Sequence, residues 1–185
     1  MSSEGTFPGT DLKADPPPAR LGTHVVFTVD AKAANGQQET LVCLVYKDTL
    51  HTPRWGLPGG TWGEFDHESP VHAAARLVRV RLDSDAGVSP VVIGVDWVPR
   101  DRYAPGVNVV LDGGELTDVA ANLMRPTPGS GYGEVRFVAV DKLDTVVIDQ
   151  HSKRRIVAAL EARKAGRGFP MTQLGVPLPD VVRSA

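Results

Sequence analysis

The residues with the clearest chemical potential lie in one stretch, residues 57–87, and form two groups of opposite charge. After a Gly-Gly turn comes an acidic group, Glu64, Asp66 and Glu68. A set of arginines follows, Arg76, Arg79 and Arg81. Carboxylates can hold a divalent cation or act as a general base, whereas guanidinium groups grip phosphate or carboxylate through two hydrogen bonds. The stretch therefore predicts either metal-assisted hydrolysis or the binding of an anion.

The arginines lie on a predicted helix, "SPVHAAARLVRVRL", for which Ser69 is the expected N-cap and Pro70 the first helical residue. The 3.6-residue period gives this helix an apolar stripe made of Val71, Ala74, Val78 and Leu82. Arg76 falls on another side, with Leu77, Val80 and Asp83, and we expect it to face a cleft. The period leaves Arg79 and Arg81 open between cleft and solvent.

The rest of the chain predicts the elements that must position these residues. Apolar and β-branched runs predict strands at 23–34, 39–48, 89–100, 106–116 and 133–143, and residues 54–60 predict a short strand that ends in a glycine turn. Further helices are expected at 117–124, as a brief turn, and at 152–166, where Gly166 ends the run. We expect the segment 169–180 to pack as a loop. This order indicates an α/β fold, a sandwich with helices flanking a mixed, mostly antiparallel sheet.

Length and composition bound the class of protein. A chain of 185 residues suits one domain, for which we expect an extended arm at 1–20, a folded part at 21–170 and a tail at 171–185. The lone Cys43 excludes an internal disulfide and fits a reducing compartment. The net charge of −2 gives no electrostatic reason to expect nucleic acid or membrane as partner. We therefore expect a cytoplasmic protein with a small-molecule ligand, and the Pro-rich arm leaves a homodimer open.

The motif "WGLPGG…ES…AAAR" resembles the Nudix hydrolase family. The family's box runs Gly, five residues, Glu, seven residues, Arg-Glu, an aliphatic residue, any residue, Glu-Glu, any residue, Gly. Glu68, Arg76 and Val78 match its first Glu, its Arg and its aliphatic position, and the lead-in matches at Gly59 and Gly60. The segments "VDWVP", "LDGGEL" and "EVRFVAVDKL" extend the resemblance, toward an actinobacterial subgroup, over roughly residues 22–180. The resemblance implies an α/β/α Nudix sandwich.

The box is degenerate at its metal ligands. The three helix glutamates that hold divalent cations in the family correspond here to Leu77, Val80 and Arg81, and the closing Gly corresponds to Asp83. Leu77 and Val80 offer no ligand atoms, while two like charges about 4 Å apart repel by about 4 kcal/mol at an intermediate dielectric. We therefore predict no metal at the family's usual position and no other cofactor.

Several residues remain as site candidates. Arg76 and Arg81 could grip a phosphate or carboxylate in place of a cation. Trp62 could stack on a flat ligand beside Gly59 and Gly60. Each has a structural alternative, since Arg81 could equally face solvent and Trp62 could pack against its own loop. A surviving hydrolase would instead use a displaced carboxylate set, for which the candidates are Glu64, Asp66, Glu68 and, near the family's loop base, Glu134.

Three functions follow from these alternatives. The first is a Nudix-fold protein that has lost metal-dependent pyrophosphohydrolase chemistry and now performs metal-independent catalysis or ligand binding in a biosynthetic pathway. The second is a rewired hydrolase of a nucleoside diphosphate-linked substrate, with Mg²⁺ held by the loop carboxylates. The third is a non-catalytic module that binds a nucleotide or sugar-phosphate. The sequence favours the first, because the scaffold is intact where the helix glutamates are replaced.

Overall fold

The computed structural model describes residues 19–33, 35–48, 53–62, 68–99, 104–147, 149–166 and 171–177. Within them a twisted sheet of nine strands lies between two long helices. The strands are β1 (Arg20–Lys32), β2 (Gln38–Lys47), β3 (Arg54–Gly56), β4 (Gly59–Thr61), β5 (Val92–Val98), β6 (Gly106–Glu115), β7 (Tyr132–Ala139), β8 (Met171–Gln173) and β9 (Val176–Pro177). The helices are α1 (Pro70–Leu82), α2 (Asp118–Leu123), α3 (Leu143–Val146), which follows a 3₁₀ turn at Val140–Lys142, and α4 (Gln150–Ala165).

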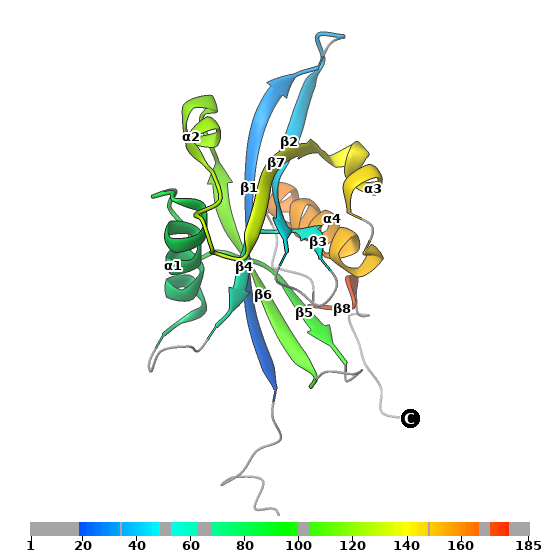
Figure 1. Ribbon diagram of the computed structural model, residues 1–185. Coiled ribbons are helices and arrows are strands. Elements are labelled where there is room, and N and C mark those ends of the chain that lie inside the picture. The colour runs from blue at the N-terminus through cyan, green and yellow to red at the C-terminus, as the bar shows by residue number, and fades with distance from the viewer. Residues whose placement is uncertain are drawn as a thin grey trace, which may run out of the picture.

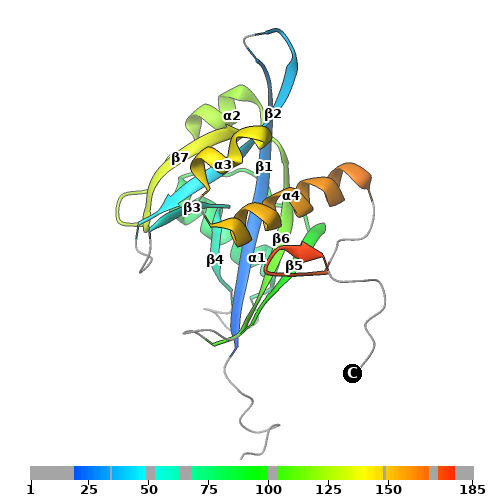
Figure 2. The ribbon, with the colours of Figure 1, turned by 90° about the vertical axis from the view of Figure 1, so that its right-hand side faces the viewer.

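The two long helices cover opposite faces of the sheet. Figure 1 places α1 on one side of the long strand β1 and α4 on the other, and Figure 2, turned by a quarter, shows α4 crossing the near face with α1 behind it. Most strand pairs are antiparallel, and the parallel pairs in the described chain are β1 with β6 and β5 with β8. The predicted α/β/α sandwich with a mixed, mostly antiparallel sheet is therefore confirmed.

The strands β1 and β2 run together only at one end and then diverge. They pair from Thr28–Lys32 to Gln38–Val42, after which β1 pairs with β4 at Gly22–His24 and β2 pairs with β3 at Val45–Lys47. The strands β3 and β4 thus fill the space between the two diverging strands. We call this part of the sheet the wedge. It consists of β3, β4 and the strand segments that pair with them, residues 22–24 of β1 and 45–47 of β2. Its strand β4 contacts α1, whereas β3 is drawn on the α4 side (Figure 1).

Each face of the sheet has its own apolar cluster. The face under α1 is packed with residues that include Phe27, Cys43, Val78 and Leu82. The face under α4 contains Leu44, Val110 and Ile156. The alternation of adjacent strand residues between faces, as at Cys43 and Leu44, is the period-2 pattern of a sheet that is covered on both sides. Cys43 is fully buried, which raises the pKa of its thiol to about 12 and makes it a packing residue.

Local signals fix the ends of α1. The Ser69 hydroxyl accepts a hydrogen bond from the backbone N–H of His72, and Pro70 opens the helix, as predicted. The helix ends at Asp83, whose φ of 46° lies in the left-handed region. This is where the family pattern has glycine, the residue that adopts such a φ without strain. Asp83 therefore has a backbone conformation that suits glycine better than a residue with a Cβ atom.

The C-terminal segment departs from prediction. Instead of a loop, Met171–Gln173 forms β8, which pairs in parallel with β5, and Val176–Pro177 pairs back on it as β9. The reason is a buried carboxylate: Asp96 of β5 accepts hydrogen bonds from the Thr172 hydroxyl at 2.7 Å and the Gly175 N–H at 2.8 Å. Short strands held by one side chain leave no hydrophobic period for sequence reasoning to detect. Among the described residues no helix is long and apolar enough to cross a membrane.

Candidate functional site

Of the predicted site residues that the structure describes, all but Glu134 lie around the wedge and the inner side of α1. Glu68 and Arg76 form a two-bonded ion pair, in which the Arg76 Nε donates to Oε1 at 2.6 Å and its terminal nitrogen to Oε2 at 3.0 Å. The side chain of Glu68 is only 7% exposed. Both of its oxygens are therefore held by Arg76, so the pair joins the start of α1 to the body of that helix.

Arg81 leaves α1 toward the wedge rather than toward solvent. Its guanidinium carbon lies 5.4 Å from the centroid of the Tyr132 ring. One guanidinium nitrogen also approaches β4, and a Cβ added at Gly60 would lie 3.5 Å from it. Arg81 thus lies beside β4 at ordinary van der Waals distance from position 60. The neighbouring Arg79 is exposed. Helical spacing alone could not distinguish the two arginines, and the structure shows that Arg81 is the one that packs against β7 and β4.

The other box positions on α1 separate into buried and exposed residues. Leu77 is 2% exposed and its methyl groups pack against Gly60. Val80 is 54% exposed and faces solvent. Leu77 and Arg81 therefore both reach β4, and Arg81 is the one that brings a charge there. A guanidinium occupies this part of the site, whereas the family pattern places a carboxylate there.

Tyr132 connects β7 to the start of β4, where the sequence predicted a glycine turn and the structure has a short strand paired with β1. Its hydroxyl accepts a hydrogen bond from the Gly59 N–H at 2.8 Å and donates one to the Gly59 carbonyl at 2.6 Å. Burial raises the pKa of Tyr132, so the hydroxyl keeps the proton that it donates. Gly59 itself has a φ of 142°, and a Cβ there would come within 2.1 Å of the Thr23 carbonyl. Glycine is thus required at 59 by the close approach of β1.

Two basic residues that sequence reasoning missed lie at the same place. Lys47 ends β2, directly opposite Arg54 of β3 and next to Tyr132 of β7 in register. Burial, followed by the charges of Arg155, Arg54 and Arg81, lowers the pKa of Lys47 to about 7. His24 of β1 lies against Gly59, and its buried Nδ1 has no hydrogen-bond partner among the described residues.

The electrostatic character of the wedge is therefore cationic. Burial is the main reason that the pKa of His24 is held well below its ordinary value, and the charge of Lys47 contributes next. Arg155 of α4 is partly neutralised, since both Nε and a terminal nitrogen donate to Asp96 at 2.8 and 2.5 Å. Lys47, Arg54 and Arg81 form no ion pair with any carboxylate that the structure describes.

The tryptophans occupy three different settings. The Trp62 indole N–H donates to the Glu68 carbonyl at 2.6 Å, so this ring is tied to the entry of α1. Trp55 packs on the α4 side, with its ring 5.5 Å from that of Tyr46 and 4.8 Å from the Arg136 guanidinium. Trp97 lies at the far end of the sheet and is 37% exposed. Trp62 is thus the tryptophan that contacts the candidate site, through its hydrogen bond to Glu68.

Glu134 lies apart from Arg81. A register shift in the pairing of β2 with β7 falls beside Gly133. Tyr132 contacts the cluster under α1, whereas Glu134 pairs with Arg136 at 2.5 Å on the side where Arg136 covers Trp55. Both side chains of this pair are about half exposed, at 49% and 51%. Glu134 therefore stands on the other face of β7 from the Arg81 contact.

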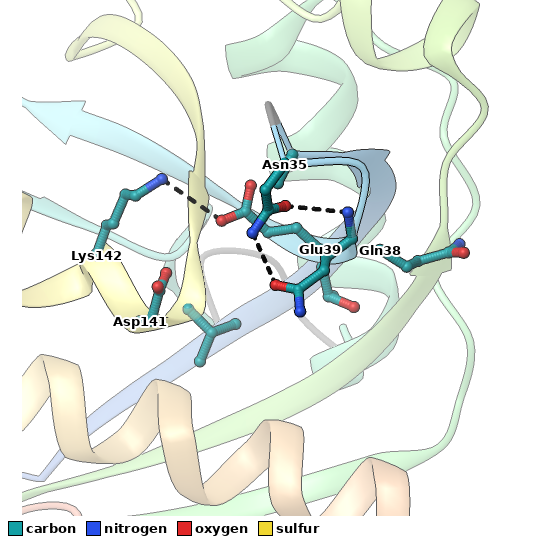
Figure 3. A pocket seen from close by; sticks show the side chains of 9 residues that line it. Asn35, Gln38, Glu39, Asp141 and Lys142 are labelled. Carbon is teal, nitrogen blue, oxygen red and sulfur yellow. Dashed lines mark hydrogen bonds and ion pairs between the residues drawn. The ribbon is translucent and has the colours of Figure 1, made fainter.

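The remaining carboxylate candidates, Glu64 and Asp66, lie outside the described residues. Within the described ranges, no group of three His, Cys, Asp or Glu side chains is arranged to hold a metal ion. An open, polar hollow in the described surface lies elsewhere, at the β1–β2 hairpin, with a volume of about 410 Å³. Figure 3 shows its polar lining, in which Lys142 pairs with Glu39. This hollow is distinct from the wedge and contains none of the predicted site residues.

Comparison with solved structures shows that this architecture is the Nudix fold. The NUDIX domain of Shewanella oneidensis NrtR, solved in complex with ADP ribose, is 17% identical, and the match covers 90% of this chain and 100% of that one with a TM-score of 0.61. MutT protein from Methanosarcina mazei Go1 is 16% identical over 82% of this chain and 98% of its own, with a TM-score of 0.58.

An ADP-ribose pyrophosphatase from Streptococcus suis 89-1591 is 14% identical over 84% of this chain and 99% of its own, with a TM-score of 0.54. No protein-family model matches the sequence, and no curated protein sequence matches it. At these identities the likeness establishes the fold. What the site does must be argued from its own residues.

Proposed function

We propose that this Nudix-fold protein binds a phosphate-bearing small molecule at the wedge without a divalent cation, and that it serves a biosynthetic pathway in place of standard pyrophosphate hydrolysis. The observation that carries the proposal is the placement of Arg81, which reaches from α1 to Tyr132 and Gly60. A guanidinium supplies fixed positive charge and paired donors, which suits a phosphate oxygen as a cation would. The ADP ribose bound by the NrtR domain makes ADP-ribose a reasonable first probe.

The described residues do not fit a magnesium ion. Magnesium prefers hard oxygen ligands in octahedral geometry. Here Leu77 is apolar and buried, Arg81 brings like charge, and the carboxylate of Glu68 is already bound by Arg76 through both oxygens. Moving Glu68 to a metal would leave Arg76, whose side chain is only 20% exposed, without this partner. This cost favours metal-independent binding.

The test is a pair of measurements on purified protein. Thermal unfolding with ADP-ribose in EDTA should show stabilisation of the wild type, loss of that stabilisation in Arg81→Met and its retention in Arg79→Met. The second variant is a matched control because Arg79 lies on the same helix and is exposed. Hydrolysis of nucleoside diphosphate-linked compounds is then followed with Mg²⁺ and with Mn²⁺. Robust turnover that requires the metal would overturn the proposal.

The rewired hydrolase makes a different prediction at Glu68. If this residue held a catalytic cation, Glu68→Gln would abolish turnover and weaken cation binding measured by calorimetry. We expect instead that the substitution affects the stability of the loop and α1, because its visible role is the ion pair with Arg76. Metal-dependent turnover that disappears in Glu68→Gln, in a variant that remains folded, would favour the hydrolase.

A further inference from the structure

The wedge brings basic groups from several parts of the chain to one place. Lys47 and Arg54 are directly opposite in the β2–β3 pair. Two like charges at directly opposite positions destabilise a sheet unless a negative charge nearby compensates them. On the other side of Lys47, in register, is Tyr132, and Arg81 lies over its ring. Four elements, β2, β3, β7 and α1, thus converge on one cationic position.

The charged and titratable groups that face Lys47 can be assigned element by element. Arg54 comes from β3, Arg81 from α1, Arg155 from α4, His24 from β1 and Tyr132 from β7. Of these, Arg155 is the one that has a buried carboxylate partner in the described structure, Asp96. The carboxylate of Asp149, the N-cap of α4, offsets part of the charge of Arg54. The cationic excess at Lys47 therefore comes from Arg81 and from the remaining charge of Arg54. An anion is the kind of ligand that would relieve it.

We propose that the wedge is a binding site for a doubly charged oxyanion, such as a phosphate group or sulfate, and that Lys47 takes up a proton when the anion binds. The proposal rests on the proposed function, because it assigns the charge of the group bound at the same site. It goes further in naming Lys47 as a contact residue and in coupling binding to pH.

The coupling follows from the state of Lys47 without ligand. Its pKa of about 7 means that the amine is largely neutral at slightly alkaline pH. A dianion among Arg54, Arg81 and Lys47 favours the charged amine and raises that pKa. The bound state then holds more protons than the free state. Affinity must fall as pH rises through 7, by about tenfold for each unit by which the anion raises the pKa.

Sulfate is the suitable probe because it does not titrate between pH 5 and pH 9, so any proton uptake belongs to the protein. Calorimetric titration of the full chain with sodium sulfate is carried out at pH 6.0 and 8.5, and at pH 7.0 in two buffers of different ionisation enthalpy. We expect binding about tenfold weaker at pH 8.5 than at pH 6.0. At pH 7.0 the heat should depend on the buffer, which reports proton uptake.

Substitutions distinguish the contribution of Lys47 to sulfate binding and proton uptake from the contributions of its neighbours. Lys47→Arg keeps a permanent charge, so it should bind sulfate without proton uptake and with little pH dependence. Lys47→Met should bind weakly at both pH values. Lys142→Met, which removes an exposed lysine at the hairpin hollow, should behave as wild type. Proton uptake that persists in Lys47→Arg and disappears in His24→Gln would overturn the assignment to Lys47.

The failure of this inference can be distinguished from failure of the proposed function. If wild-type protein binds ADP-ribose in EDTA but shows no sulfate binding, or binds sulfate with no pH dependence, the dianion site at Lys47 is wrong and the proposed function stands. If neither ligand binds at either pH, the proposed function falls with it. Thermal unfolding of each variant confirms that it is folded before its binding is interpreted.

Discussion

The guanidinium of Arg81 lies over the ring of Tyr132, and the hydroxyl of Tyr132 holds both backbone groups of Gly59. Through these contacts α1, β7 and the start of β4 meet at one side chain. The glycine pair of the "LPGG" segment is thus kept in position by a tyrosine, and α1 contributes a cation beside it. This arrangement gives the site its shape and the sign of its charge.

Tyr132→Phe should destabilise the protein by about 1–3 kcal/mol, because it leaves the Gly59 N–H and carbonyl without their partner in a buried setting. Urea unfolding at pH 7 measures the change. The matched control is Tyr46→Phe, which alters a partly buried tyrosine whose ring packs against Trp55. Equal effects of the two substitutions would contradict the role assigned to the Tyr132 hydroxyl.

Asp96→Asn should cost about 3–5 kcal/mol, since it removes the charge opposite Arg155 in a pair that is almost fully buried. The same carboxylate holds β8 through Thr172 and Gly175, so the C-terminal strands should also lose protection from hydrogen exchange. Asp144→Asn, in the more exposed pair with Lys153, should change stability by less than about 1 kcal/mol. A small effect at Asp96 would mean that the buried pair is dispensable.

Asp83→Gly should stabilise the protein by about 0.5–1 kcal/mol, because φ at the end of α1 is 46° and glycine adopts it without a Cβ clash. The control is Asp85→Gly, at an exposed position nearby that is not among the residues with positive φ. There the added freedom of the unfolded chain should leave stability unchanged or lower. The two variants are compared by their midpoints of urea unfolding.

The stability of the protein should depend on pH through Lys47. Its pKa is about 7 in the folded chain, against an ordinary value of 10.5, so the unfolded chain holds more protons between those two values. Wild-type stability gains from this group as pH rises through that window. Below pH 7 Lys47 is charged in both states, and the folded state bears the cost of holding that charge in a partly buried place among arginines.

Lys47→Met removes this titration. The stability of the variant minus that of the wild type should therefore be greatest near pH 6 and should shrink toward pH 9, by an amount on the order of a few kcal/mol. Urea unfolding of both proteins at the two pH values gives the difference directly, and other titrating groups cancel. A difference that stays constant with pH would show that Lys47 has an ordinary pKa.

The features that sequence predicted are those encoded locally. The N-cap at Ser69, the start at Pro70 and the end of the last helix at Gly166 depend on single residues and their backbone preferences. The strands on either side of α1 were expected from their apolar runs, and the order of strands and helices along the chain was enough to give the fold class.

The features that sequence missed depend on contacts between distant residues. Lys47 and His24 become part of the site because β1 and β2 diverge, which is set by pairing with β3 and β4. The ending of β2 in lysine opposite an arginine was visible only once that register was known. Likewise, Arg79 and Arg81 had equal claims from helical spacing, and contact with Tyr132 distinguished them.

The central claim is that a guanidinium takes the place of a divalent metal ion at this site. Calorimetric titration of the wild-type protein with ADP-ribose, once in EDTA and once with excess magnesium chloride, tests it most directly. We predict binding in EDTA that magnesium does not strengthen and that Arg81→Met abolishes. Binding that occurs only with magnesium, and that survives in Arg81→Met, would contradict the account.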